Sequence, residues 1–432
     1  MKYPLLIASA LALTTTVMAQ NNGSNSPYSR YGFGLLNDRH SAASTALAGT
    51  GYGWRGGTEV NFKNPASFSA IDSLSFIFDV GLSLQNANIK QGNQSVNARN
   101  TSIDYITVGF RGARHLGFSL GMIPFSTIGY SMNDKRTWTA STGDVTETEA
   151  HNGNGGLQQV YLGVGWEPFR GFSIGVNGGY LWGDMEHNIV ASYSDPTINT
   201  RRRTYDAHVK TYTVNFGLQY EQRIDKKNSI ILGLVYGLGH KTQGYANYYD
   251  QQRQNKVYVG DTLSLRNGFE LPHTFGVGLT WNYNNRLRVA ADYTLQKWSK
   301  VQYPTLSRST SGYTYTAETG LFSDLSKYSL GAEYVVNPDG YRWYNRIRYR
   351  LGAAYTTPYT KVNGSDGPRN YQVSAGVGIP IINSHSNRCV LNLAAGFEHV
   401  APQISGSLKE NYMRVSIGVT FNESWFNKWK AQ

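Results

Sequence analysis

The 432-residue sequence contains a single cysteine, Cys389, and no continuous apolar run of about 18 residues. One cysteine cannot form an internal disulfide, and without such a run no transmembrane helix is expected. Catalytic signatures are also missing, because no H-E-x-x-H, G-x-S-x-G, P-loop or C-x-x-C pattern occurs and the nine histidines lack metal-ligand spacing. We therefore expect neither an enzyme nor a protein that holds a metal or cofactor.

Acidic residues are scarce relative to basic ones, with 28 Asp and Glu against 40 Lys and Arg and a formal net charge of +12. A basic balance raises the question of nucleic-acid binding, but no basic helix or stripe concentrates the charge. We expect contact with anionic lipid headgroups and lipopolysaccharide instead, and no nucleic acid. The run Arg201-Arg202-Arg203 is expected in a long loop, either as a clamp for lipopolysaccharide phosphates or as a solvated loop.

The first twenty residues have the pattern of a secretory signal. A short basic start, Met1-Lys2, precedes an apolar run from Leu5 to Leu13, and Val17-Met18-Ala19 is a small-residue cleavage pattern. Residues 1–19 are therefore expected to be a signal peptide, with Gln20 as the new N-terminus.

Alternation of apolar and polar residues fills the chain from Leu74 to Phe421. In one segment every second residue from Tyr212 to Tyr220 is apolar, so Tyr212, Phe216 and Tyr220 share one face of the strand. The residues between them are polar or Gly and occupy the other face. The expected strands, each uncertain by about 2–4 residues at its ends, are 74–84, 103–112, 115–126, 157–166, 172–182, 206–223, 229–240, 271–283, 287–297, 325–336, 346–358, 370–380, 388–398 and 411–421.

The connections between these segments are alternately short and long. Short Asn-, Asp- or Gly-containing links such as Asn284–Arg286 alternate with long polar stretches such as Gly129–Gly156 and Ser299–Asp324. An even strand count with tight turns at one end and long loops at the other is typical of bacterial outer-membrane barrels. The sequence therefore predicts an all-β fold, a 14-stranded antiparallel transmembrane β-barrel over residues 74–421, in the cell outer membrane.

Residues 20–73 precede the first strand and are rich in Gly, Ser and Asn. They include Tyr31 and Phe33, which need burial. We interpret the segment as a leader followed by an N-terminal lumenal plug, with a disordered periplasmic tail as the alternative. At the other end, residues 422–432 are expected to form an aromatic and basic periplasmic tail whose interface anchors are Trp425, Phe426 and Trp429.

Five short motifs in the expected order resemble those of the FadL-type (FadL/TodX) outer-membrane transporter family. They are Asn64-Pro65-Ala66, Gly121 to Ser126 with its Pro124-Phe125, Leu271 to Gly278, Asp292-Tyr293 with the following Trp298-Ser299, and Arg350-Leu351-Gly352 with Tyr355 and Pro358. The resemblance covers Ala48 to Phe421. The leader and tail look more like Bacteroidetes members, in which the same barrel also serves as a subunit of secretion or assembly machinery.

The resemblance implies uptake of hydrophobic or amphipathic, fatty-acid-like small molecules, with lateral release through the barrel wall at Pro124 and Phe125. A proline inside a strand cannot donate its ladder hydrogen bond, so it indicates a bulge or gap, or else a strand that ends at the rim. The alternative function is a non-transporting barrel subunit or shuttle in an outer-membrane secretion or barrel-assembly complex, with other outer-membrane or periplasmic proteins as partners.

Two groups of residues are candidate sites. Asn64, Pro65 and Ala66 are expected to latch the plug to the barrel, because Asn bonds a turn backbone, Pro fixes chain direction and Ala permits close approach. The second group shares the inward face of its strands and is either a ligand carboxylate or phosphate site or a charge-balanced network that braces barrel and plug. Its members are Arg288, Asp292, Glu333, Arg346, Arg348 and Arg350.

Overall fold

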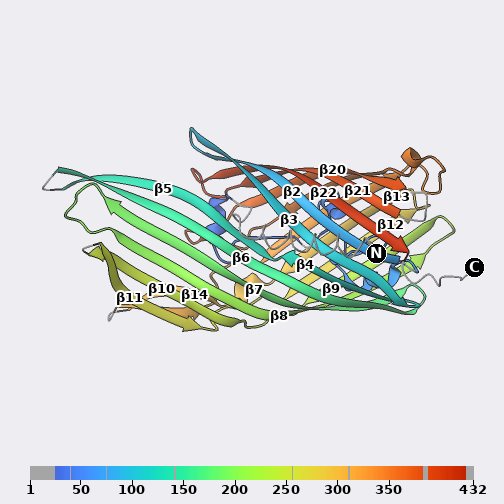
Figure 1. The fold of residues 1–432 in the computed structure, drawn as a ribbon, viewed down its shortest axis with the longest axis horizontal. Coiled ribbons are helices and arrows are strands. Elements are labelled where there is room, and N and C mark those ends of the chain that lie inside the picture. Colours follow the sequence, from blue (N-terminus) through green and yellow to red (C-terminus); the bar gives the residue numbers. More distant parts are fainter. Residues whose placement is uncertain are drawn as a thin grey trace, which may run out of the picture.

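The computed structural model describes residues 25–38, 40–73, 75–140, 143–254, 256–309, 312–382 and 388–424. Fourteen antiparallel strands form a closed barrel, in which the last strand pairs with the first through Ser424 and Ser75 (Figure 1). The strands of this ring are β2 (Ser75–Gln91), β3 (Gln94–Ala113), β4 (Leu116–Pro124), β6 (Gly143–Phe169), β7 (Phe172–Tyr193), β8 (Arg201–Arg223), β9 (Asn228–Gly237), β12 (Thr274–Tyr283), β13 (Leu287–Gln296), β16 (Leu325–Val335), β17 (Arg348–Thr356), β20 (Arg369–Ile382), β21 (Arg388–Ala401) and β22 (Lys409–Ser424). The predicted 14-stranded antiparallel barrel is confirmed.

The two faces of the wall differ as the alternation predicts. On β22, Met413 and Val415 are 64% and 47% exposed on the outside, whereas Ser416 and Thr420 are buried against the interior. An apolar outer face with polar residues inside is the arrangement that a lipid bilayer requires of a barrel. No helix among the described residues is long and apolar enough to cross a membrane.

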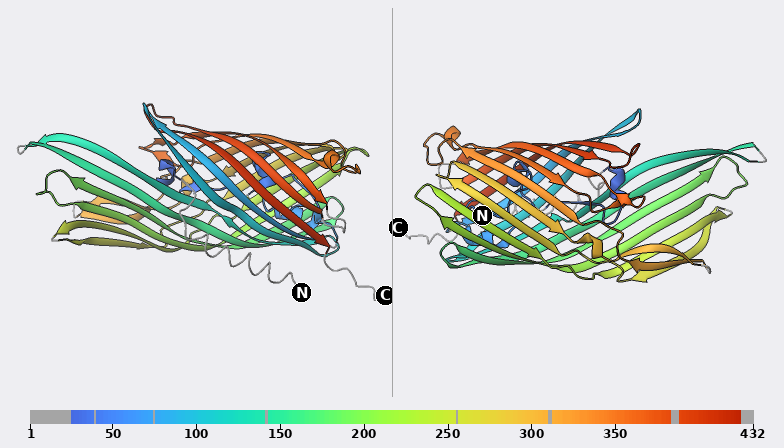
Figure 2. Two further views of the ribbon diagram at one scale, coloured as in Figure 1. Left: turned by 45° about the horizontal axis from the view of Figure 1, so that its top comes forward. Right: turned by 180° about the vertical axis from the view of Figure 1, so that it is seen from behind.

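One side of the barrel wall continues far beyond the ring, at the end that carries the long connections (Figures 1 and 2). There the outer parts of β6, β7 and β8 are joined by β5 (Ser126–Ala140), β10 (Gln243–Gln254) and β11 (Val257–Arg266). Pairing runs in the order β5, β6, β7, β8, β10, β11. We call these six strands the outer sheet; long connections lie outside the cell in barrels of this class.

The outer sheet corrects two expectations from the sequence. Gly129–Gly156 was expected to be a loop, but it forms most of β5 and the outer half of β6. Arg201, Arg202 and Arg203 were also expected in a loop, but they begin β8. Because their outer face meets water and not lipid, these strands carry charged residues such as Lys135 and Arg136 and lack the apolar alternation that marks a membrane strand.

Residues 26–72, which we call the N-terminal segment, hold four short elements: the 3₁₀ helices η1 (Pro27–Arg30) and η2 (Pro65–Ala70), the strand β1 (Leu35–Leu36) and the helix α2 (Ala42–Thr45). Each of the three helices begins at a side-chain cap, namely Ser26, Asn64 and Ser41. Helix α2 packs against β20, β21 and β22, and η2 against β3, β4, β6, β7 and β8. The segment therefore contacts inward-facing residues on both sides of the barrel.

Two smaller pieces complete the fold at the same end as the outer sheet. The hairpin of β14 (Tyr303–Ser309) and β15 (Gly312–Glu318) follows the 3₁₀ helix η3 (Trp298–Lys300). A two-residue ladder joins β18 (Lys361–Val362) to β19 (Ser365–Asp366). At the opposite end, the 3₁₀ helix η4 (Trp343–Arg346) occupies the link between β16 and β17.

Candidate functional site

Asn64, Pro65 and Ala66 lie together near the short-turn end of the barrel interior. The Asn64 side chain is fully buried, and its Oδ1 accepts a hydrogen bond from the Ala66 N–H at 3.1 Å. Its Nδ2 donates to the Tyr52 carbonyl at 2.8 Å and to the Leu218 carbonyl of β8 at 3.2 Å. Asparagine thus caps η2 and ties it to the barrel wall, while Pro65 supplies a first helical residue that needs no N–H partner.

Glycines on the facing strands allow this close approach. A Cβ at Gly175 of β7 would overlap the backbone of Pro65 and Ala66, and a Cβ at Gly217 of β8 would overlap the Asn64 side chain. Any larger residue would require η2 to move, since the wall is held by its ladder of hydrogen bonds.

Glu333, Arg350 and Arg288 form a buried charge network on neighbouring strands. Arg350 Nε donates to Glu333 Oε2 at 2.8 Å and Arg350 Nη1 donates to Asn392 Oδ1 at 2.6 Å. The two side chains are only 1% and 3% exposed. Arg288 lies 4.0 Å from Glu333 and its guanidinium stacks over the Trp54 ring. This arrangement links three strands of the wall to the N-terminal segment.

Asp292 belongs to a separate contact with the N-terminal segment. Its Oδ2 accepts hydrogen bonds from the backbone N–H groups of Gly51 at 2.7 Å and Tyr52 at 3.0 Å. Lys63 adds an ion pair at 3.3 Å and lies over the Tyr52 ring. The carboxylate, which is 1% exposed, therefore binds backbone that comes from about 240 residues earlier in the chain.

The other two arginines of the predicted group stand apart from Asp292. Arg348 Nη2 reaches Thr58 Oγ1 of the N-terminal segment at 3.5 Å. Arg346 ends η4 and precedes the strand, so it lies in the link at the short-turn end. The structure thus brings Arg288, Glu333 and Arg350 together, and gives Asp292 and Arg348 separate partners on the N-terminal segment.

Sequence reasoning did not single out Arg55. Arg55 Nη2 donates to Glu167 Oε2 at 2.9 Å, and Nη1 donates to Ser69 at 3.0 Å and Ser173 at 2.8 Å. This guanidinium therefore joins the N-terminal segment to β6 and β7. No local pattern marks it, because its partners lie far apart in the chain.

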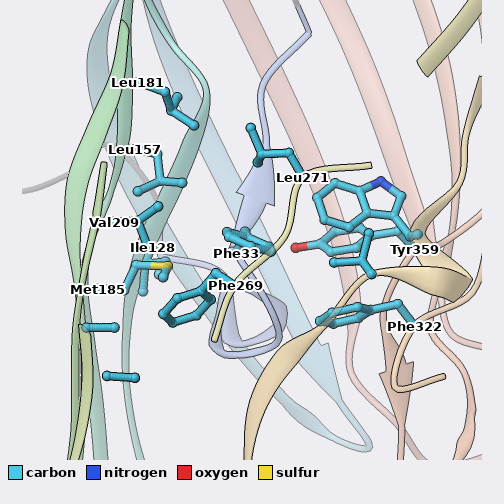
Figure 3. Close-up of a cluster of buried hydrophobic side chains, with 14 of the residues drawn as sticks. Phe33, Ile128, Leu157, Leu181, Met185, Val209, Phe269, Leu271, Phe322 and Tyr359 are labelled. Atoms are coloured by element: carbon cyan, nitrogen blue, oxygen red, sulfur yellow. The ribbon is translucent and has the colours of Figure 1, made fainter. Parts of the chain in front are cut away.

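Aromatic side chains pack together at the mouth of the barrel (Figure 3). Phe33 of the N-terminal segment is fully buried, with ring centroids 5.5 Å from Trp298 and 5.7 Å from Phe269. Tyr359 lies 4.8 Å from Trp298 and donates a hydrogen bond to the Gly34 carbonyl. Because these rings come from three separate connections and from the N-terminal segment, they join the loops over the lumen into one packed core.

Between the N-terminal segment and the wall lies a cavity of about 110 Å³. Its lining mixes apolar residues such as Phe62 and Trp298 with the polar side chains of Lys63 and Thr213. This volume is well below the roughly 300–1,000 Å³ of pockets that hold small-molecule ligands.

Pro124 ends β4, and Phe125 separates it from β5. The Phe125 N–H donates to the Leu157 carbonyl of β6 at 2.8 Å, so the missing N–H of Pro124 is on the opposite side, toward β3. The ladder between β3 and β4 runs only as far as Ile106 and Met122. Pairing with β3 therefore stops two residues before the proline.

Several charged residues of the outer sheet form ion pairs. Arg201 Nε donates to Asp250 at 2.8 Å, and this hydrogen bond lowers the pKa of the Asp250 carboxyl. Arg203 pairs with Glu149 at 2.6 Å. Burial lowers the pKa of His187 to about 4, so its imidazole is neutral where it meets the Tyr130 hydroxyl at 2.9 Å.

Two remaining predictions, on the tail and on metal binding, stay predictions. The tail residues Trp425, Phe426 and Trp429 lie outside the described residues. Among the residues that the structure describes, no group of three or more His, Cys, Asp or Glu side chains is placed to hold a metal ion.

A family model described as BamG matches residues 1–432. No curated protein matches the chain. Several solved structures are similar to it over nearly their whole length, including the toluene transporter TodX of Pseudomonas putida, with a TM-score of 0.59, 15% identity and coverage of 90% of this chain and 99% of that one.

Two further solved structures agree with this likeness. The toluene transporter TbuX of Ralstonia pickettii has a TM-score of 0.57 at 14% identity, covering 90% of this chain and 99% of that one. A FadL homologue from Pseudomonas aeruginosa has a TM-score of 0.58 at 12% identity, covering 90% and 98%. The predicted likeness to FadL/TodX barrels is thus confirmed at the level of the fold, which is that of outer-membrane proteins.

Proposed function

The chain belongs to the BamG family, and on that premise we propose that it is a non-transporting barrel subunit of an outer-membrane complex with a role in barrel assembly. The family name hints at assembly. In this proposal the barrel anchors the outer sheet in the membrane and presents it to other proteins.

The observation that carries the proposal is the set of buried contacts between the N-terminal segment and the inner face of the barrel wall. The N-terminal segment is bonded to the wall through Asn64, Asp292 and Arg55, and the cavity beside it is about 110 Å³. We propose that the segment is a fixed plug, that Asn64, Pro65 and Ala66 latch it, and that the inward-facing charged residues brace it. A permanently braced interior suits a scaffold better than a conduit.

The test is to purify the tagged full-length protein from its native outer membrane in mild detergent. We expect other outer-membrane or periplasmic proteins to co-purify in fixed stoichiometry. A lone barrel that carries lipid or fatty-acid-like molecules would contradict the proposal and support transport.

Removal of residues 425–432 provides a second comparison. Asn422, Glu423 and Ser424 still pair with β2, so the truncation spares the barrel ladder. A subunit that docks through its aromatic and basic tail is expected to lose a partner, whereas a transporter is expected to tolerate the change. If the truncated protein purifies with the same partners in the same amounts, the tail takes no part in the proposed contact.

One observation favours a second candidate function, the uptake of a hydrophobic small molecule with lateral release. Pairing between β3 and β4 ends at Ile106 and Met122, next to Pro124. The similar barrels named above include toluene transporters. Under this proposal an apolar ligand passes from the interior to the bilayer beside Pro124 and Phe125.

Replacement of Pro124 by alanine tests this route. Alanine restores an N–H that points toward β3 and allows the ladder to extend, so lateral release predicts at least a tenfold lower rate of toluene or fatty-acid uptake. The rate is measured in proteoliposomes, with wild-type protein as the reference. Unchanged uptake would count against the lateral route, and absent uptake in both proteins would count against transport.

A further inference from the structure

The link between β16 and β17 is long for the short-turn end of the barrel, which lies opposite the outer sheet (Figures 1 and 2) and faces the periplasm in barrels of this class. It has twelve residues, 336–347, whereas the link between β6 and β7 has two and the link between β12 and β13 has three. The Asn337 N–H donates to the Asn345 carbonyl at 2.8 Å, which closes the link at its base around η4. A long connection with a structure of its own is a common place for binding residues.

The link begins beyond the level of the lipid headgroups. Tyr334 on β16 and Tyr349 on β17 lie directly opposite each other in the ladder and are 48% and 45% exposed on the outer face of the wall. Exposed aromatic residues near the strand ends mark the membrane–water interface in such barrels. Because the chain passes Tyr334 as it leaves the wall and Tyr349 after it returns, residues 337–345 follow this pair on the periplasmic side.

Three aromatic side chains in the link are open to solvent. Tyr341 is 100% exposed, Trp343 53% and Tyr344 44%. The Arg342 guanidinium donates a hydrogen bond to the Tyr344 hydroxyl and stacks over the ring at 5.8 Å. We call these four residues the aromatic tip. Trp, Tyr and Arg are the residues that contribute most to binding at protein interfaces, so the tip has the composition of a protein contact.

Two arginines beside the aromatic tip lack a carboxylate partner. The Glu333 carboxylate is bonded to Arg350. Arg346 and Arg348 make no ion pair with a described residue, and Arg346 Nε has no hydrogen-bond partner among those residues. Both side chains are only half-buried, so an acceptor from outside the chain can approach them. Carboxylates are the acceptors that form the strongest hydrogen bonds with guanidinium groups in proteins.

The side of the wall on which these arginines lie favours a protein over the membrane as the partner. Arg348 is on the inner face, because it reaches Thr58 of the N-terminal segment at 3.5 Å, and Glu59 supplies a single negative charge at longer range. Arg346 precedes it by two residues with an extended backbone at Ile347 between them, so it follows the same side. Lipid headgroups surround the outside of the wall and cannot contact arginines on its inner face, whereas a segment that enters from the periplasm can.

We propose that the aromatic tip, Arg346 and Arg348 form a docking site for an acidic segment of a periplasmic protein. Carboxylates of the segment pair with the two guanidinium groups, and its apolar residues pack against Tyr341 and Trp343. Bidentate hydrogen bonds between arginine and carboxylate would supply both affinity and direction. This inference rests on the proposed function, because it names a surface through which the subunit binds a partner and the chemistry of that partner.

The first test places a photo-crosslinking residue at position 341 of the full-length protein in its native outer membrane. Tyr341 is fully exposed, so its replacement removes no packing contact. After irradiation, the adducts are identified by mass spectrometry. We expect an adduct with a periplasmic protein, at a peptide that is rich in Asp or Glu. Adducts with phospholipid alone, or with a second copy of this chain alone, would overturn the docking site.

Substitutions in the crosslinking protein then measure what each half of the site contributes. Arg346→Gln removes one guanidinium and is expected to lower the adduct yield at least tenfold, whereas Arg346→Lys keeps the charge and is expected to lower it threefold or less. Trp343→Ser changes only the exposed tip and is also expected to lower the yield tenfold. The matched control is Trp166→Ala, since Trp166 is an outward-facing tryptophan at the same end of the barrel and is 49% exposed. Its adduct yield is expected to stay within twofold of the reference, and folding of every variant is checked by resistance to SDS.

The outcomes separate the two proposals. An unchanged yield in Arg346→Gln or in Trp343→Ser, an equal loss in Trp166→Ala, or no adduct at position 341 would each overturn the docking site. The wild-type protein would still purify with its partners in these cases, and the proposed function would stand. A wild-type protein that purifies alone would contradict the proposed function and the docking site together.

Discussion

Replacement of Arg350 by methionine is expected to lower the free energy of unfolding by about 3–5 kcal/mol, the usual cost of removing one member of a buried ion pair. Glu333 would lose its 2.8 Å hydrogen-bond partner, and its remaining ion-pair contact, with Arg288, is longer, at 4.0 Å. Because the Glu333 side chain is 3% exposed, solvent cannot replace the lost hydrogen bond. The measurement is a urea titration of the detergent-solubilised barrel, followed by tryptophan fluorescence.

The double variant Arg350→Met with Glu333→Gln is the control for this prediction. It removes the charge that the single variant leaves unpaired, so it is expected to be more stable than Arg350→Met alone. A single variant that loses less than about 1 kcal/mol, the range of an exposed pair, would show that water reaches Glu333. The network would then not brace the barrel.

Replacement of Gly175 by valine is expected to displace η2 and open the lumen. A Cβ at this position would overlap the backbone of Pro65 and Ala66, and the wall cannot yield because β7 is hydrogen-bonded on both sides. We expect the barrel to remain folded and its single-channel conductance in planar bilayers to rise at least tenfold. The variant is also expected to become sensitive to protease within residues 40–73.

Gly178→Val on the same strand is the matched control. No atom lies within 4 Å of a Cβ built at Gly178, so valine is accommodated there without a clash. Closed channels in both variants would contradict the proposed plug, since displacement of η2 would then leave the lumen blocked by other residues. Open channels in both would indicate that any change in β7 loosens the barrel.

The position and type of the barrel strands follow from the sequence because the membrane imposes a sharp difference between the two faces of each strand. Tyr212, Phe216 and Tyr220 are exposed on one side of β8 while Thr213 and Gln219 are buried on the other, as the alternation predicts. The same reasoning failed for β5, β10 and β11, where no lipid-facing apolar row is required and residues such as Lys135 and Gln252 interrupt the periodic signal.

The inward-facing charges were predictable as a set but not in their pairing. Parity places Arg288, Glu333 and Arg350 on the inner face of adjacent strands, and the register then sets Glu333 opposite both arginines. Nothing in the local sequence indicates that Asp292 binds the backbone of Gly51 and Tyr52, since that contact depends on how the N-terminal segment folds inside the barrel.

The sequence by itself determined a fourteen-stranded membrane barrel, because a two-residue period is a local property that lipid and water select strand by strand. Only the tertiary structure decided which residues pack against the inner face of the wall and what extends from the barrel. The bonds of Asn64, Arg55 and Asp292 join residues more than 100 positions apart, and the outer sheet is built from strands that belong to three separate connections. Such features arise from the arrangement of whole elements, which no local pattern of residues records.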